Sequence, residues 1–104
     1  MDRDGGNPEI RRIMDELWQL HVRKDADYAG GDSLGNFRLA ERFGVPAWKG
    51  AAIRMSDKFS RFVSLVNKGK AQVSDESMED TLKDLAIYAM IVIALRRRRQ
   101  FGNG

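Results

Sequence analysis

The chain has 104 residues and no cysteine, which excludes disulfides, zinc–thiolate sites and cysteine nucleophiles. Its 18 Lys and Arg against 15 Asp and Glu give a net charge of +3, and because four cations are consecutive at Arg96 to Arg99, the remainder is close to neutral. This balance argues against a nucleic-acid binder that uses its whole surface. The length suits one domain over residues 1–104, with flexible ends at 1–7 and 100–104, near the size at which oligomerisation commonly adds buried surface.

The opening residues and the most apolar segment predict a cytoplasmic protein without membrane contact. The start, Met-Asp-Arg-Asp-Gly-Gly, lacks the cationic and apolar stretches of a secretory signal. The apolar run from Leu85 to Leu95 is shorter than the roughly 20 residues that a membrane-spanning helix needs.

A first helix is predicted from Pro8 to about Asp27, because Asn7 can cap it and proline suits its first position. Its apolar residues recur at helical spacing, and Lys24 and Tyr28 extend the same stripe with a cation and a phenol. These two side chains either contact a ligand or keep their polar ends in water. His21, the only histidine, has no metal or triad spacing around it, so we interpret it as packed or in contact with a ligand.

Residues 28–37 form a glycine-punctuated turn into a short helix, which Asp32 or Ser33 can cap and Gly44 should end. The turn is not a phosphate loop, because the Walker spacing is absent.

A second long helix is predicted from Ala47 to about Lys68, between Pro46 and Gly69. Its apolar face should consist of Trp48, Ala52, Met55, Phe59, Phe62, Val63 and Val66. Arg54, Lys58 and Arg61 form a separate stripe that can hold a chain of phosphates. The alternative is a solvated face on which Asp57 pairs with Arg61.

The last helix should run from about Asp75 to about Arg99, capped by Ser74 or by Ser77, which forms a capping box with Asp80. Asp80 and Asp84 share a stripe that continues into the apolar run, so they are candidates for a partly buried charged site. Alternatively, the acids only meet the positive end of the helix dipole, the reading favoured for Glu79.

From Leu85 onward this helix is apolar nearly all round, which implies a central position in a bundle or a subunit interface. The terminal arginines suit the negative end of the helix dipole, and nucleic-acid binding through them is the alternative. With no β-hairpin signal, we expect an all-α fold: a compact helical bundle of three long helices plus one short helix, forming a homo-oligomer.

Several blocks occur together over most of the chain: residues 24–28 (Lys-Asp-Ala-Asp-Tyr), 36–37 (Asn-Phe), 54–61 (Arg-Met-Ser-Asp-Lys-Phe-Ser-Arg) and 75–88 (Asp-Glu-Ser-Met-Glu-Asp-Thr-Leu-Lys-Asp-Leu-Ala-Ile-Tyr). Together they resemble the phage and prophage nucleotide-modification-associated family of small helical domains. The resemblance implies a phage-related protein, in the host cytoplasm, that binds or acts on nucleotides.

The last block is also similar to the final metal-binding helix of MazG-like nucleotide pyrophosphatases, in which acids from two helices hold Mg²⁺. Asp80 and Asp84 match that half of the site, whereas the first acidic motif, Glu-Glu-x-x-Glu, is absent here. The sequence thus predicts a nucleotide-binding protein that sequesters a nucleotide or a cyclic-nucleotide signal, with a Mg²⁺-dependent pyrophosphohydrolase as the alternative. The expected ligand-binding residues are Lys24, Tyr28, Asn36, Phe37, Arg54, Lys58, Arg61 and Tyr88, and the expected Mg²⁺-binding residues are Glu79, Asp80 and Asp84.

Overall fold

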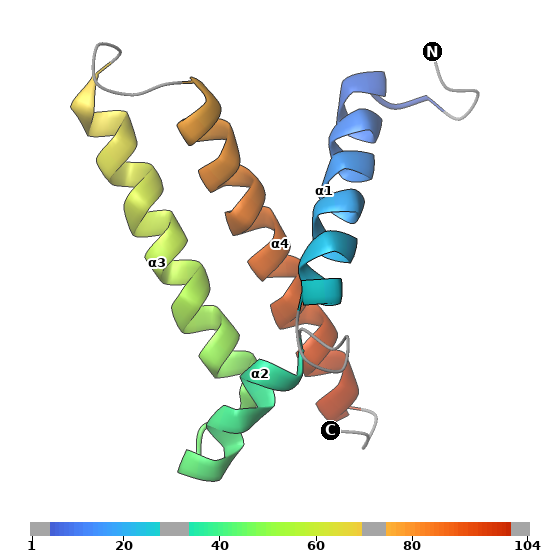
Figure 1. Cartoon of the computed structure of the whole chain (residues 1–104), viewed down its shortest axis with the longest axis vertical. Coiled ribbons are helices and arrows are strands. Elements are labelled where there is room, and N and C mark those ends of the chain that lie inside the picture. The colour runs from blue at the N-terminus through green and yellow to red at the C-terminus, as the bar shows by residue number, and fades with distance from the viewer. Residues whose placement is uncertain (1–4, 28–33, 70–74, 101–104) are drawn as a thin grey trace. The chain divides into compact units, whose positions relative to one another are not determined.

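A computed structural model describes residues 5–27, 34–69 and 75–100 of the chain (Figure 1). Throughout these ranges the regular structure is helical and no strand occurs, which confirms the all-α prediction. The elements are α1 (Pro8–Asp27), α2 (Gly35–Arg38), the 3₁₀ helix η2 (Leu39–Phe43), α3 (Ala47–Lys68) and α4 (Asp75–Gln100). The expected flexible ends fall partly on residues 1–4 and 101–104, which lie outside the described residues.

The chain divides into two compact units, Met1–Ser33 and Leu34–Gly104. The first unit contains α1, and the second contains α2, η2, α3 and α4. None of the described helices combines the length and the apolar character that crossing a membrane would take.

The start of α1 follows the predicted capping pattern. The Oδ1 atom of Asn7 accepts a hydrogen bond of 2.7 Å from the N–H of Glu9, and Pro8 occupies the first helical position. Both features satisfy or remove amide groups that have no partner inside the helix. Further along α1, the rings of Trp18 and His21 lie 5.6 Å apart, so the single histidine contacts an aromatic neighbour.

The short helical segment formed by α2 and η2 ends at Gly44, as predicted. Gly44 has a φ of 78°, a left-handed conformation that glycine adopts without steric cost. Its N–H donates to the carbonyl of Glu41, and the N–H of Val45 donates to the carbonyl of Ala40, each over 3.1 Å. The second half of the predicted short helix is the 3₁₀ helix η2, a form that is common at helix ends. The expected caps Asp32 and Ser33 lie outside the described residues.

Helices α3 and α4 lie side by side and run in opposite directions (Figure 1). Ala47 and Ala51 of α3 and Leu95 of α4 form the buried cluster between them. The small alanine side chains allow the two backbones to approach closely at this end. Larger, partly buried side chains surround the cluster, namely Leu34, Phe37, Trp48, Ile91 and Val92.

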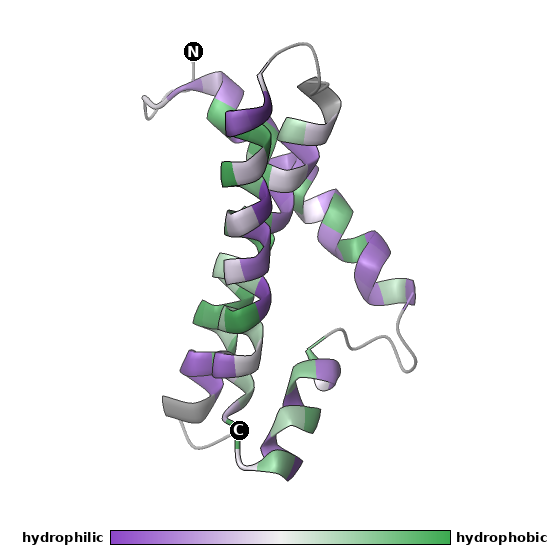
Figure 2. Cartoon of the chain, turned by 90° about the vertical axis from the view of Figure 1, so that its left-hand side faces the viewer, coloured by the Kyte–Doolittle hydropathy of each residue, from purple (hydrophilic) through white to green (hydrophobic). Residues whose placement is uncertain are grey.

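The face of α3 that contacts α4 differs from the predicted apolar face. Among the predicted core residues, Phe59, Val63 and Val66 are 54%, 41% and 54% exposed, whereas Ala51 and Leu65 are buried. At about 100° per residue, the buried face lies between the predicted apolar stripe and the basic stripe. Figure 2 shows polar and apolar residues interleaved along α3. The prediction was therefore wrong for Phe59, Val63 and Val66, but Trp48 does pack against the buried cluster. It overlooked Ala51, whose small side chain permits close packing.

The start of α4 also corrects one prediction. The helix begins at Asp75, so Ser77 lies inside it and cannot form the predicted capping box with Asp80. Instead, the Ser77 carbonyl accepts a 2.8 Å hydrogen bond from Oγ1 of Thr81, which is buried. The other expected cap, Ser74, lies outside the described residues.

Candidate functional site

The basic stripe of α3 and the acidic stripe of α4 meet at Lys58 and Asp84. The Nζ atom of Lys58 is 3.3 Å from Oδ2 of Asp84, and the two side chains are 31% and 24% exposed. Asp84 is thus partly buried, as the sequence predicted, whereas Asp80 is exposed. This ion pair is the contact at which the two predicted stripes meet.

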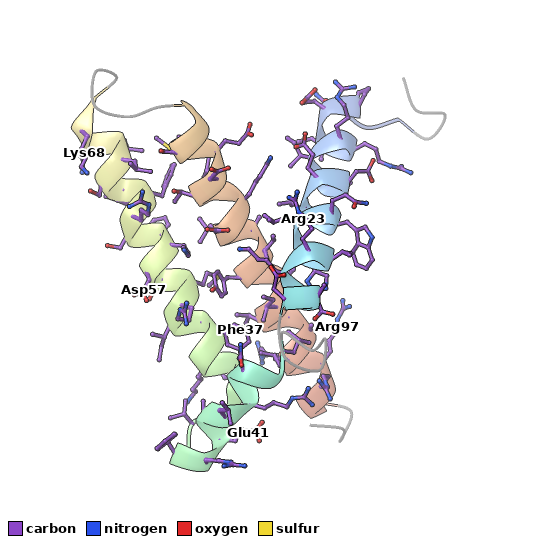
Figure 3. All side chains as sticks on the ribbon, in the orientation of Figure 1. Arg23, Phe37, Glu41, Asp57, Lys68 and Arg97 are labelled. Atoms are coloured by element: carbon purple, nitrogen blue, oxygen red, sulfur yellow. The ribbon has the colours of Figure 1, made fainter. Side chains whose placement is uncertain are left out.

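An aromatic and cationic group lies one turn away from the ion pair. The guanidinium carbon of Arg54 is 6.0 Å from the centre of the Tyr88 ring, within the range of a cation–π interaction. On α2, the Phe37 ring meets Tyr88 edge to face, with 6.1 Å between the ring centres. Phe37 extends from α2 toward the α3–α4 pair in Figure 3, while Asp57 points outward from α3.

The two contacts are one helical turn apart on both helices. Arg54 and Lys58 are four residues apart on α3, and their partners Tyr88 and Asp84 are four residues apart on α4, which runs in the opposite direction. Side chains four residues apart lie one above the other on a helix, so two facing rows result. We call Phe37, Arg54, Lys58, Asp84 and Tyr88 the Lys58 cluster.

The remaining predicted ligand residues lie around or outside the Lys58 cluster. The register places the exposed residues Arg61 and Asp80 at about the next level, one turn beyond the ion pair. Asn36 is exposed on α2, next to Phe37. Lys24 is exposed on α1, which belongs to the other unit, and Tyr28 lies outside the described residues.

The three expected Mg²⁺ ligands are not gathered at one point. Oε2 of Glu79 lies 3.2 Å from Nζ of Lys83, and the Glu79 side chain is 68% exposed. Asp84 pairs with Lys58 instead. Within the described ranges, no three His, Asp or Glu side chains form a group suited to a metal ion. A Mg²⁺ ion at α4 would therefore compete with two lysines for Glu79 and Asp84.

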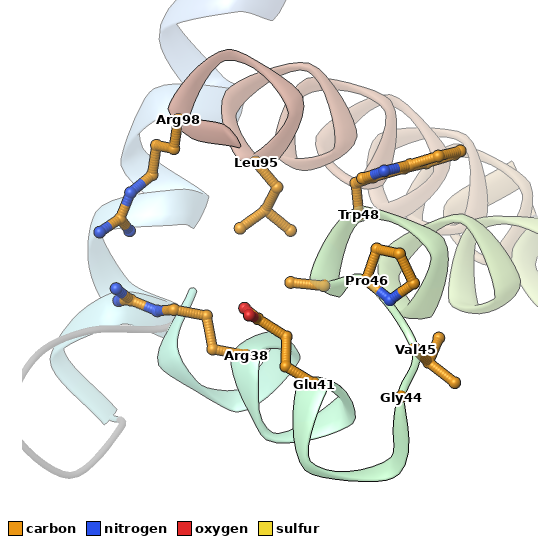
Figure 4. A pocket seen from close by; sticks show the side chains of 9 residues that line it. Arg38, Glu41, Gly44, Val45, Pro46, Trp48, Leu95 and Arg98 are labelled. Atoms are coloured by element: carbon orange, nitrogen blue, oxygen red, sulfur yellow. The ribbon is translucent and has the colours of Figure 1, made fainter. Parts of the chain in front are cut away.

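A second feature, which no sequence pattern predicted, lies at the end of the α3–α4 pair where η2 is. A pocket of about 340 Å³ opens between η2, the start of α3 and the end of α4 (Figure 4). Arg96 lies 5.2 Å from the Trp48 ring centre, and Lys49 lies 5.6 Å from it. In the sequence no aromatic residue interleaves with Arg96 to Arg99, so the sequence favours a helix end that suits the negative end of the helix dipole. The pocket lining consists of Arg38, Glu41, Gly44, Val45, Pro46, Ala47, Trp48, Leu95 and Arg98.

Comparison of the chain with protein-family models, with curated proteins and with solved structures found no match in any of the three. The resemblance to phage nucleotide-modification-associated domains stays a prediction from the sequence blocks. The function must therefore be inferred from the chemistry of the residues described above.

Proposed function

We propose that this protein binds a phosphorylated nucleotide at the Lys58 cluster. The observation that carries the proposal is the placement of two α3 cations, Arg54 and Lys58, on successive turns beside an aromatic pair contributed by α2 and α4. In this arrangement the two cations could bind phosphates, Asp84 could bind the sugar and the aromatic rings could bind the base.

The α3 cations are the proposed phosphate ligands. Arg54 and Arg61 are exposed and Lys58 is partly buried, so all three amine or guanidinium groups are within reach of a ligand on the surface. Guanidinium groups bind phosphate oxygens through paired hydrogen bonds, and lysine acts as a compact point charge. Lys58 must exchange its Asp84 partner for phosphate, which leaves Asp84 able to accept hydrogen bonds from a ribose hydroxyl or a base amine.

The aromatic pair is the proposed base-binding surface. Phe37 is partly exposed and already lies against Tyr88 in an edge-to-face arrangement, so its ring orientation is held by packing. Aromatic rings bind nucleobases by stacking without selecting strongly among them. Asn36, adjacent and exposed, can donate to or accept from a base edge and supply part of the selectivity.

The alternative function is Mg²⁺-dependent hydrolysis of a phosphoanhydride, with Asp80, Asp84 and Glu79 as the ligands. The ion pairs of Glu79 with Lys83 and of Asp84 with Lys58 favour binding over this alternative. Both functions take a nucleotide and share Asp84, so one experiment with nucleotides can separate them.

Self-association is part of the proposal. Exposed apolar side chains form a stripe on each of the paired helices: Phe59, Val63 and Val66 on α3, and Leu82, Met90 and Ile93 on α4. Surface apolar residues of this size and number commonly mark protein–protein contacts. We propose that copies of this chain associate through them.

The test is to incubate the protein with NTPs, dNTPs and cyclic nucleotides, with and without Mg²⁺, and to analyse the protein by native mass spectrometry and the ligands by chromatography. Retention of an intact nucleotide supports binding. Conversion to monophosphate and pyrophosphate only with Mg²⁺ supports the hydrolase. No bound ligand and no turnover with the whole panel contradicts both.

A matched pair of variants locates the site. Lys58→Gln should weaken nucleotide binding about tenfold, since charge-assisted contacts to phosphate are lost. Lys68→Gln removes the same charge from the exposed end of the same helix (Figure 3) and should leave affinity unchanged. Equal weakening by both variants would indicate general attraction to a basic surface instead of a site at the Lys58 cluster.

A further inference from the structure

We infer that the pocket between η2, the start of α3 and the end of α4 is a separate binding site for a small phosphate monoester with a flat, apolar organic part. None of its lining residues belongs to the Lys58 cluster. Its volume of about 340 Å³ falls within the range of small-molecule sites in proteins.

The charges around the pocket select an anion. Arg38 and Arg98 come from different helices and extend toward one another on one side of the pocket, with the Glu41 carboxylate directed into the space beside them (Figure 4). Two guanidinium groups against one carboxylate leave the lining positive. Phosphate oxygens match this arrangement, because each guanidinium can donate two parallel hydrogen bonds.

The start of α3 adds to the same preference. Pro46 occupies the N-cap position, and its carbonyl accepts hydrogen bonds from the N–H groups of Lys49 and Gly50. It has no side-chain acceptor to offer, so the N–H groups of Ala47 and Trp48 gain no side-chain cap from it. Both residues line the pocket. The positive end of a 22-residue helix dipole therefore lines the same pocket as the two arginines.

The rest of the lining is apolar. Leu95 and Ala47 belong to the buried cluster, and Pro46 and Trp48 present their rings beside them. Arg96 and Lys49 both lie against the Trp48 ring, which restrains the indole. A flat apolar group can cover this wall while its phosphate meets the arginines, whereas inorganic phosphate alone would leave the wall exposed to water.

The test uses the fluorescence of Trp48. Because the chain has two tryptophans and Trp18 is 61% exposed, Trp18→Phe gives a folded background in which Trp48 is the only indole. Titration with phenyl phosphate should change the Trp48 emission in a saturable manner. Inorganic phosphate should bind more weakly, and benzyl alcohol, which lacks the charge, should give no saturable change.

Three further variants test the assigned residues. Arg98→Gln should weaken phenyl phosphate binding about tenfold. Arg97→Gln removes the same charge from the preceding residue, which is exposed and does not line the pocket, and should not weaken binding. Glu41→Gln should tighten binding about threefold, because it removes the carboxylate that repels the phosphate. Unchanged helical circular dichroism confirms that each variant is folded.

The inference is overturned by an absence of saturation, by a response to benzyl alcohol equal to that of phenyl phosphate, or by equal losses in Arg97→Gln and Arg98→Gln. Lys58→Gln should leave the phenyl phosphate titration unchanged. The two sites can therefore fail or succeed independently.

Discussion

The Nζ atom of Lys58 on α3 lies 3.3 Å from Oδ2 of Asp84 on α4. The two residues are 26 positions apart in sequence, and their contact joins the basic stripe of α3 to the acidic stripe of α4. Both side chains remain about a quarter to a third exposed, so the pair adds at most about 1 kcal/mol to the free energy of unfolding. Its main consequence concerns ligand binding, because a phosphate that approaches Lys58 must displace the Asp84 carboxylate.

Asp84→Asn is therefore expected to tighten the binding of a nucleotide measured without Mg²⁺, by about threefold, since the competing negative charge is removed. Isothermal titration calorimetry of wild type and variant measures the change. Glu79→Gln, which affects the Lys83 pair on the exposed side of α4, is the control and should leave affinity unchanged. The asparagine oxygen can still accept a hydrogen bond from the ligand, so weaker binding by Asp84→Asn would contradict the proposed competition between Asp84 and phosphate for Lys58.

Ala51→Leu should destabilise the second unit by about 1 to 3 kcal/mol. Ala51 has no exposed surface between α3 and α4, so added methylene groups force the helices apart or into strained rotamers. Ala26→Leu is the matched change at an exposed position of α1, where both residues are good helix formers. Urea unfolding followed by circular dichroism should show a lower midpoint for Ala51→Leu alone; equal midpoints would contradict the close packing of α3 on α4.

Ile93→Glu should disrupt self-association, because it places a charge within the exposed apolar stripe of α4. Ile53→Glu is the matched control: Ile53 is 60% exposed, against 50% for Ile93, but its neighbours on the helix surface are polar. Sedimentation velocity over a range of concentrations should show a smaller species for Ile93→Glu only. If the wild type is monomeric throughout, the proposed association is wrong.

Asn7→Ala should weaken α1 by about 1 kcal/mol, because the N–H of Glu9 loses its acceptor at the first turn. Asn67→Ala makes the same change at an exposed position inside α3 and should cost little or slightly stabilise the helix. Amide hydrogen exchange at the start of α1 measures the effect. Unchanged exchange in Asn7→Ala would contradict the role of Asn7 as the cap.

The bounds of the long helices were predictable from the sequence. Asn7 with Pro8 marks the start of α1, and Pro46 and Gly69 delimit α3 to the residue. These signals are local: each depends on the φ preference of one residue or on one hydrogen bond within a turn. The end of the short helical segment at Gly44 was predictable for the same reason, although its 3₁₀ geometry was not.

The choice of packing face was decided only by the tertiary structure. The sequence predicts one apolar face of α3 that includes Phe59, yet the face containing Ala51 contacts α4 while Phe59 stays exposed. Periodicity identifies an apolar stripe, but it contains no information on how closely a second helix can approach. Close approach depends on the shapes of both surfaces, which belong to segments far apart in the chain.

For the residues of the candidate site, too, part was predictable from local sequence and part depended on tertiary packing. Arg54, Lys58 and Asp84 were recognisable as candidates from their types and helical spacing, yet their meeting with Tyr88 and Phe37 required the antiparallel register of α3 and α4. The contact of Arg96 with Trp48 has no local signal at all. By itself, the sequence determined where helices begin and end and which charges each carries, because those depend on neighbours within a turn. Only the tertiary structure decided which charges face one another and where a pocket opens, because both depend on long-range packing.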